Sequence, residues 1–388
     1  MSRLLFVIKK NIKKQKGDMI TFAILMFIVS LLMYASISSI IGVGNVLDTL
    51  HKDINGSDVE VIFDKTNKTG EDEYYEEFLG KIGKYINDDR DYKEIEKDKL
   101  MDLTVDHKNN DDSEYITSEF FMASFDKKRI ISKIKLPDGL KDDDILLPYN
   151  MSGKYKKGDK IQFKFEEKEF TFNVAGFIED PIYATTLNIM VYYVLVSDGA
   201  YEKINNVIQN ETICFDADVY RMKVNEGILA PDKDKELDSK IRDLFSEIRD
   251  EDPDIEAVSS FIVVNYDDMK GGASFMSMIV MALICMVAFL TLIVSLVMIG
   301  LSIRNFINRD IKNTSILEAC GYTVSELRKY CIAQNVIIAG TGSILGIITA
   351  MCLNKVVGNI VSLTLGVKWN QPINILIGII IFMAMKIM

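Results

Sequence analysis

Four long stretches without charged residues divide this chain. No Asp, Glu, Lys or Arg occurs between Asp18 and Asp48, between Lys270 and Arg304, between Lys329 and Lys355, or between Lys368 and Lys386. An apolar helix needs about 20 residues to cross the hydrocarbon layer of a membrane. Helices of globular proteins normally keep one polar face, and the apolar region of a cleavable signal peptide is shorter, about 7 to 15 residues. The pattern therefore predicts transmembrane helices at 19–47, 271–303, 331–354 and 372–388, the second with a stalk beyond the membrane.

The region between the first two predicted spans, 48–270, alternates strand-like and helical patterns. A strand at 58–64, a helix and a strand at 114–125 form one predicted unit, and strands at 212–224 and 255–266 flank the helix of a second unit. Between them, about 130–200 reads as a β-rich insert, with a hairpin turn at Glu166 and Glu167. The apolar helical faces are Tyr75, Phe78, Leu79, Ile82 and Ile86, and then Leu237, Ile241, Leu244, Phe245 and Ile248. These patterns predict a large mixed α+β domain.

The distribution of charge predicts the orientation in the membrane. Residues 48–270 carry 52 acidic and 31 basic residues, whereas 4 acidic and 14 basic residues lie elsewhere. Lys and Arg near the ends of spans are retained on the cytoplasmic side. We therefore expect 1–18, a basic amphipathic helix, and the segment 304–330 in the cytoplasm, and 48–270 and a loop at 355–371 outside. The acidic runs at 88–98 and 141–144 lack the ligand spacing of a calcium loop and are expected on solvated surface.

The sequence offers little support for catalysis. Its two histidines, His51 and His107, are isolated from any cysteine or carboxylate set at metal-ligand spacing, and no phosphate-binding loop or nucleophile motif occurs. The four uncharged stretches hold no Asp, Glu, Lys, Arg or His residue, which argues against ion-coupled transport. We therefore expect no enzyme activity, metal, cofactor or nucleic-acid partner. An ectoenzyme would require a reactive cluster that the sequence does not contain.

The segment 304–330 is too short for a domain but has features of a docking element. Gly321 is placed to end one helix, and Thr323 with Glu326 forms a capping box that starts another. Ile311, Ile316, Leu317 and Tyr322 are apolar side chains that either dock in a partner's groove or cover the membrane interface. Gly342 and Gly346, in the following span, have the spacing that lets helix backbones approach closely, within one chain or between two.

Residues 315–346 resemble the signature region of FtsX-like, MacB-type ABC transporter permeases. Leu317, Ala319 and Gly321 keep the family pattern, and Gly340, Gly342 and Gly346 match its glycine-rich stretch. Asn313, Glu318 and Gln334 depart from it. Residues 145–180 resemble the β-rich part of the MacB-type extracellular domain. The order of one span, a large outer domain and three further spans also matches this family.

The resemblance implies a membrane α-helical protein of the MacB-like architecture, with four transmembrane helices and a large α+β extracellular domain. It implies a cell-membrane permease that works with a separate cytoplasmic ABC ATPase, which binds the ATP, with a second permease chain and with the lipid bilayer. The ATPase would move the extracellular domain for export, extraction or resistance to peptides, antimicrobials or lipid-linked compounds. The residues expected to bind the ATPase are Arg309, Asp310, Ile311, Ile316, Leu317, Glu318, Ala319, Gly321 and Tyr322.

The alternative is a membrane sensor or FtsX-like regulator that transports nothing. Its extracellular domain would bind a peptide or control a cell-wall hydrolase. ATP turnover by the partner would then persist while no compound moved. The last predicted span, 372–388, fits either the end of a four-span permease or a boundary within a longer one.

Overall fold

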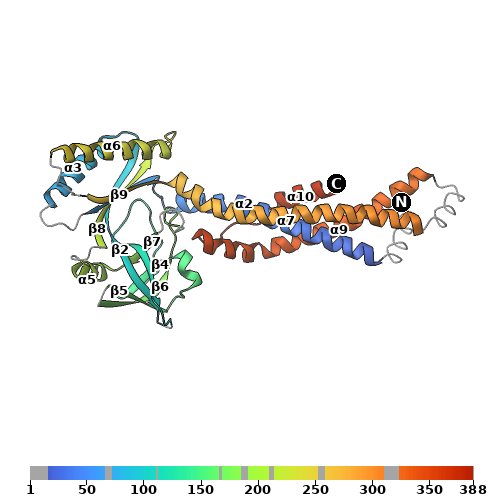
Figure 1. Ribbon diagram of the computed structural model, residues 1–388, viewed down its shortest axis with the longest axis horizontal. Coiled ribbons are helices and arrows are strands. Elements are labelled where there is room, and N and C mark those ends of the chain that lie inside the picture. The colour runs from blue at the N-terminus through green and yellow to red at the C-terminus, as the bar shows by residue number, and fades with distance from the viewer. Residues whose placement is uncertain are drawn as a thin grey trace. The chain divides into compact units, whose positions relative to one another are not determined.

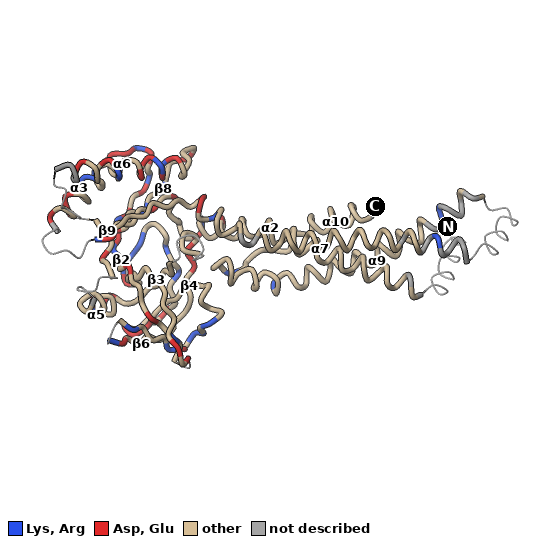
Figure 2. Tube along the Cα trace, in the orientation of Figure 1, with Lys and Arg blue, Asp and Glu red and all other residues tan. Residues whose placement is uncertain are grey.

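The protein consists of two units in a computed structural model (Figure 1). We call Met1–Gly42, Ser277–Asn359 and Gln371–Met388 the helical unit, and Val43–Met276 with Ile360–Asn370 the sheet unit. The described residues are 16–65, 72–110, 112–165, 168–184, 191–208, 214–251, 258–309 and 323–387. Lys, Arg, Asp and Glu gather in the sheet unit, whereas the described parts of the long helices carry few of them (Figure 2).

Three of the described helices are long and apolar enough to cross a membrane. Their apolar parts are Met19–Asp53, Tyr266–Met298 and Ile332–Leu365. A fourth helix, α10, has 13 residues and is shorter than the other three. The full bounds are Lys16–Asp53 for α2, Tyr266–Arg309 for α7, Val324–Leu365 for α9 and Ile375–Ile387 for α10.

Helix α9 is longer than the span predicted for it. It continues past residue 354 to Leu365, into the range 355–371 that was predicted to be a loop. Lys355 is the single charge in this extension, Gly358 lies within it without ending the helix, and Gly366, which follows it, has a positive φ of 75°. Glycine is the residue that adopts this backbone conformation without a steric penalty, so it ends the helix here.

One part of the sheet unit contains the second predicted strand–helix–strand unit and a first unit that differs from the prediction. The strand that follows α3 here is β2, which was not predicted, whereas the strand predicted at 114–125 lies elsewhere, as β3 (Ile116–Ser124). Strands β2, β8, β1 and β9 lie side by side in that order and pair antiparallel, so the two units interleave as a split βαβ arrangement. Helices α3 and α6 pack against one face through the apolar side chains that their periodicity predicted (Figure 1). The bounds are β1 Val59–Lys65, α3 Asp72–Asp88, β2 Tyr92–Asn109, β8 Cys214–Val224, α6 Ala230–Glu251 and β9 Val258–Asn265.

The β-rich insert closes into a barrel. The strand order β3-β7-β4-β6-β5-β2 is completed by pairing between β2 and β3, so six strands form a ring. Alternate side chains fill its interior, as in other small barrels, and they include Met101, Leu103, Phe120, Phe163 and Val194. Strand β2 therefore belongs to both the barrel and the split βαβ sheet. The remaining bounds are β3 Ile116–Ser124, β4 Asp144–Pro148, η1 Tyr149–Gly153, β5 Lys160–Phe165, β6 Lys168–Ile178, β7 Val191–Val196 and α5 Asp198–Ile208.

The charged residues of the acidic run at 88–98 are mostly exposed or half-buried as predicted, but the prediction of solvated surface was wrong for Asp98. Residues from Tyr92 onward form strand β2, and Asp98 is only 1% exposed. A buried carboxylate is tolerated where cations compensate its charge. Arg221 of β8 and Arg129 supply that compensation, and neither pairing can be inferred from the run itself.

Candidate functional site

Two of the long helices enter the sheet unit next to each other. Helix α2 ends at Asp53 and residues 54–58 lead into β1, whereas β9 ends at Asn265 and α7 begins at the next residue. Val59 of β1 lies opposite Asn265 of β9 in the register of these paired strands. We call residues 48–58 and 265–270 the joint. Any displacement of either helix at the joint is applied directly to neighbouring strands of the sheet.

Side chains of the two helices hold the joint together. The rings of His51 and Tyr266 stack with centroids 3.8 Å apart. The Tyr266 hydroxyl donates to Asp48 Oδ1 at 2.9 Å, and Lys270 Nζ donates to the same oxygen at 2.6 Å. The Tyr266 N–H also donates to the backbone oxygen of Asp58 at 2.9 Å. These contacts join the last turns of α2 to the first turn of α7.

Asp58 connects the joint to strand β8. Lys223 Nζ donates to Asp58 Oδ1 at 2.7 Å and to the Gly56 carbonyl at 2.6 Å, and the Val224 N–H donates to Asp58 Oδ2 at 2.9 Å. His51 Nε2 lies 3.3 Å from Asp58 Oδ1. Burial acts to raise the pKa of Asp58, but the His51 and Lys223 contacts outweigh it and hold the pKa below its ordinary value. The carboxylate therefore stays ionised as the anchor of this connection.

Asn265 caps helix α7 from inside the sheet unit. Its side chain is fully buried, its Oδ1 accepts the Asp268 N–H at 2.9 Å, and its Nδ2 donates to Asp268 at 2.8 Å. This pairing satisfies an N–H group that the first turn of a helix otherwise leaves free. Nδ2 also donates to Asp234 of α6 at 2.6 Å. The first turn of α7 is thus fixed to a second helix of the sheet unit.

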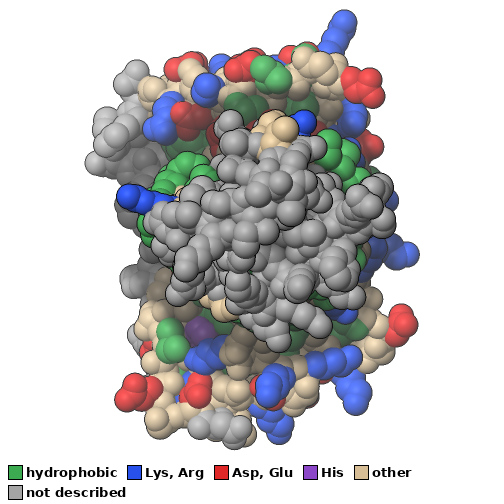
Figure 3. Space-filling view, turned by 90° about the vertical axis from the view of Figure 1, so that its right-hand side faces the viewer, with side chains coloured by type: hydrophobic (Ala, Val, Ile, Leu, Met, Phe, Trp, Pro, Cys, Tyr) green, Lys and Arg blue, Asp and Glu red, His purple; other side chains and the backbone are tan. Residues whose placement is uncertain are grey.

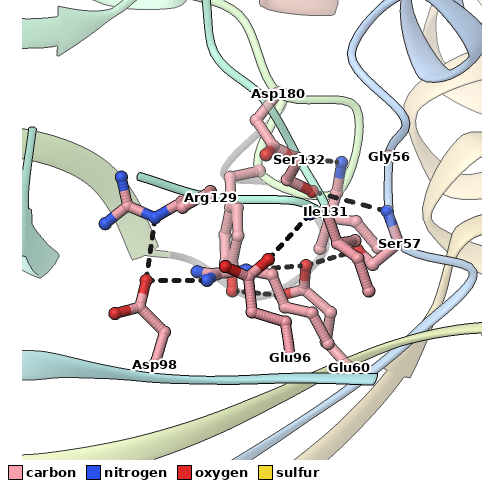
Figure 4. A network of polar contacts seen from close by, with 12 residues as sticks. Gly56, Ser57, Glu60, Glu96, Asp98, Arg129, Ile131, Ser132 and Asp180 are labelled. Carbon is pink, nitrogen blue, oxygen red and sulfur yellow. Dashed lines mark hydrogen bonds and ion pairs between the residues drawn. The ribbon is translucent and has the colours of Figure 1, made fainter. Parts of the chain in front are cut away.

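A buried ionic network lies beside the joint (Figure 4). Arg221 is 1% exposed, donates from Nη1 to Asp98 at 2.9 Å and makes an ion pair with Glu60 at 3.4 Å. Glu60 lies directly opposite Arg221 in the β1–β8 register and also accepts hydrogen bonds from the hydroxyls of Ser57 and Tyr183. The network therefore ties the start of β1 to β8 and β2.

Asp98 pairs with more than one cation. Arg129 Nε donates to it at 2.8 Å and Lys127 Nζ lies 2.5 Å away, in addition to Arg221. Burial acts to raise the pKa of Asp98, but the two guanidinium groups and the ammonium outweigh it, and the pKa lies well below its ordinary value. The carboxylate stays ionised and holds the chain after β3 against β2.

The chain at 129–134 also contacts the connector between α2 and β1. The Glu96 carboxylate accepts the N–H groups of Ile130 and Ile131 at 3.0 and 2.7 Å, and the Ser132 N–H donates to the Asn55 carbonyl at 2.9 Å. Asn55 and Ser132 both have positive φ angles, of 52° and 53°. Such angles are uncommon for non-glycine residues and persist where the surroundings fix them. The connector is therefore held from two sides.

The joint contains two ion pairs besides its hydrogen bonds. Asp48 pairs with Lys270, and Asp58 pairs with Lys223 of β8. No group of His, Cys, Asp and Glu side chains in the described ranges could hold a metal ion. Acidic and basic side chains of the protein are interspersed on the face seen in Figure 3. The arrangement can pass a displacement of α2 or α7 to the sheet and, through residues 129–134, to the barrel.

The residues predicted to bind an ATPase fall almost entirely outside the described residues. Arg309 is the last residue of α7, and α9 begins at Val324, directly after Thr323. The predicted residues Asp310, Ile311, Ile316, Leu317, Glu318, Ala319, Gly321 and Tyr322 lie outside the described ranges.

The glycines of the predicted packing stretch lie on α9. A Cβ atom on Gly342 would come within 2.5 Å of the Ala23 carbonyl oxygen, and one on Gly346 within 2.3 Å of the Phe27 carbonyl oxygen. The backbones of α9 and α2 therefore approach closely inside one chain. Gly340 is less crowded, since a Cβ there would meet only Phe382, at 3.9 Å.

The sequence analysis did not find the joint or the ionic network. A signal was present for Arg221, which occupies an inward position of the strand pattern at 214–224 between apolar residues. A cation at such a position requires a buried acidic partner. The partners lie on β1 and β2, far away in the sequence, so the strand order was needed to identify them.

Comparisons with known proteins identify the C-terminal part of the chain. One similar solved structure is a domain of a candidate permease protein from Porphyromonas gingivalis, with 11% identity, a TM-score of 0.25 and coverage of 53% of this chain and 88% of that chain. No curated protein matches the sequence. Residues 285–388, which include most of α7 and all of α9 and α10, match the C-terminal domain of FtsX-like permeases. The apolar helices and this match indicate a membrane protein whose C-terminal part, residues 285–388, is similar to FtsX-like permeases.

Proposed function

We propose that this chain is the permease subunit of an ABC transporter of the MacB-like type. Four spans would place the N-terminus and residues 304–330 in the cytoplasm and the sheet unit outside the cell. The excess of basic residues outside 48–270 supports this orientation. α10 would be the fourth span, and its residues 375–385 lie within the 17-residue uncharged stretch between Lys368 and Lys386.

The observation that carries the proposal is the continuity of α7 with the sheet unit. α7 has 44 residues and, at about 1.5 Å per residue, a length of about 66 Å, against about 30 Å for a hydrocarbon core. It joins β9 without a loop, and Asn265 and Tyr266 fix its first turn. Its last residues, 304–309, belong to the segment 304–330 that is expected to bind the ATPase.

The mechanism follows from this continuity. A separate cytoplasmic ATPase dimer would bind the segment 304–330 of two permease chains and move it during nucleotide turnover. α7 would carry this displacement to the joint, and the joint would apply it to β9 and β1. Substrate would then be moved or released on the outer side without entering the membrane.

A break in α7 tests the mechanism. Gly271 lies in the first turns of α7 with open space around it, so a Cβ there meets nothing within 4 Å. Gly271→Pro removes a helical hydrogen bond and kinks the helix, whereas Gly271→Ala keeps it continuous. With the full chain and its ATPase in lipid nanodiscs, we expect both variants to bind the ATPase and Gly271→Pro alone to lose coupled transport.

Two outcomes would contradict the proposal. Transport by Gly271→Pro at the level of Gly271→Ala would show that α7 does not carry the motion. The assignment to ABC transporters would be wrong if the wild-type chain bound no ATPase. It would also be wrong if substitution of Leu317 or Gly321 left the function of the chain unchanged. ATP turnover without movement of any compound would favour the regulator described above.

A further inference from the structure

The C-terminal end of α9 and the residues after it pack in the sheet unit. Residues 360–370 belong to that unit, and Leu365 and Val367 are buried in it. Gly366 ends the helix with a φ of 75°, and its N–H donates to the Ser362 carbonyl at 2.8 Å. A Cβ atom on Gly366 would come within 1.4 Å of the Ala184 carbonyl oxygen. No other residue type can occupy this position without displacing one of the two backbones.

Lys368 adds polar contacts just after the C-terminal end of α9. Its N–H donates to Glu179 Oε2 at 2.9 Å, and its Nζ lies 3.0 Å from Glu179 Oε1. The ammonium group also lies 5.6 Å from the centre of the Tyr149 ring. Leu363 approaches Gly153, where a Cβ would lie 3.7 Å from it. We call residues 360–370 the foot of α9.

The foot and the joint lie on different parts of the sheet unit. Glu179 directly follows β6, Ala184 lies six residues after it, and Tyr149 and Gly153 bound η1 after β4, so the foot contacts the chain that follows two strands of the barrel. α7 instead enters the split βαβ sheet through β9. The two helices that flank the segment 304–330 therefore meet the sheet unit at different places, which are linked by Tyr183, next to Ala184, through its hydrogen bond to Glu60 of β1.

We propose that α9 is a second transmission path, which acts on the barrel through its foot, and that Gly366 is the position that permits this docking. The inference rests on the proposed function, in which the segment 304–330 is moved by an ATPase. α9 is one helix of 42 residues from Val324 to Leu365, so a displacement at its first turn is carried along a continuous element. Unequal displacement of α7 and α9 would pivot the barrel against the split sheet.

Tryptophan fluorescence measures the docking of the foot directly. Trp369 is the single tryptophan of the chain, and it is partly buried with an enclosed Nε1. We compare Gly366→Ala with Gly139→Ala in the full chain without its ATPase. Gly139 has a φ of 76° and open space around it, so both variants carry the same backbone strain and only Gly366→Ala carries the collision with Ala184. Glu179→Gln serves as a milder variant that weakens the ion pair with Lys368.

We expect Gly366→Ala to shift the Trp369 emission to longer wavelength and to increase its quenching by acrylamide. The emission and quenching of Gly139→Ala should match those of the wild type. The values for Glu179→Gln should lie between those of the wild type and Gly366→Ala, and this graded response would exclude misfolding as the cause. Unchanged emission and quenching in both Gly366→Ala and Glu179→Gln would overturn the docking.

The coupling is tested in the assembled transporter. We expect Gly366→Ala to bind the ATPase as the wild type does and to lose coupled transport. If Gly366→Ala shows the fluorescence change but transports at the wild-type level, α9 is not a second transmission path, and the proposed function is unaffected. Failure of the proposed function would appear differently, as a wild-type chain that binds no ATPase while the fluorescence differences persist.

Discussion

Replacement of Arg221 by methionine removes the central cation of the buried network and keeps an apolar stem of similar length. Asp98 keeps Arg129 and Lys127 as partners in this variant. Glu60, which is fully buried, keeps only the hydroxyl donors of Ser57 and Tyr183. The variant therefore leaves one buried carboxylate without a compensating charge.

The size of the effect follows from this loss. Removal of one partner from a buried ion pair costs about 3–5 kcal/mol. A change of 1 kcal/mol shifts the Tm of a domain of this size by about 2–4 °C, so we expect the Tm of the sheet unit to fall by about 6–20 °C. The double variant Glu60→Gln, Arg221→Met removes the unpaired charge and should recover a large part of the loss.

Thiol labelling during heating measures unfolding of the sheet unit within the full chain. Cys214 lies in the barrel core and is 2% exposed, so it reacts with a dye only after that unit opens. The other cysteines, Cys285, Cys320, Cys331 and Cys352, are replaced by serine in the parent chain to make the signal specific.

Arg242→Met is the matched control. The Arg242 side chain is 66% exposed, pairs with Asp238 on α6 and lies 5.2 Å from the centre of the Phe261 ring, so its loss should change stability far less than the loss of Arg221. An Arg221→Met chain that unfolds at the temperature of Arg242→Met would refute the reasoning. A double variant no more stable than Arg221→Met would show that Glu60 is not the source of the cost.

Three further predictions concern other parts of the molecule. Burial, followed by repulsion from Asp64 and Glu119, raises the pKa of Asp102 from its ordinary value of 3.8 to about 8. Between these two values the folded chain holds a proton that the unfolded chain has lost, so this group should lower the Tm as the pH rises toward about 8 and have no further effect above it. Asp102→Asn should remove most of that fall, whereas an unchanged profile would contradict the prediction. Gly346→Ala should separate α9 from α2 and destabilise the chain in detergent by about 1–3 kcal/mol, while Gly340→Ala, with its open surroundings, serves as the control and should have little effect. Asn265→Ala should cost about 1–2 kcal/mol and speed hydrogen exchange in the first turn of α7; protection equal to that of the wild type would argue against the cap.

Periodicity predicted β1, α3, β8, α6 and β9 of the sheet unit but missed β2, whose first residues, 92–98, were interpreted as solvated surface. The apolar faces of α3 and α6 point into the core as expected, because amphipathic helices and half-buried strands have distinct spacings. The interleaving of the two strand–helix–strand units could not be predicted, because strand order depends on contacts between distant segments. The closure of the barrel through β2 and β3 has the same origin.

The candidate site was less predictable than the fold. The charged residues at 92–98 indicated solvent exposure. The cations that compensate the charge of the buried Asp98 come from β8 and from the chain after β3. The end of α9 was placed too early because Lys355 was taken as a boundary, and a single lysine does not end a helix. Gly366 gave a better stop signal, and its meaning depended on the position of Ala184.

Strand β2 has a consequence for how this protein opens. Its 18 residues pair with β8 along one part and with β3 and β5 along another, so neither substructure has a complete set of strands without it. Separation of β2 from a neighbouring strand exposes the interior of the barrel and of the split βαβ sheet. The two substructures should therefore melt in a single cooperative transition, and amide protons in the middle of β2 should be among the last to exchange.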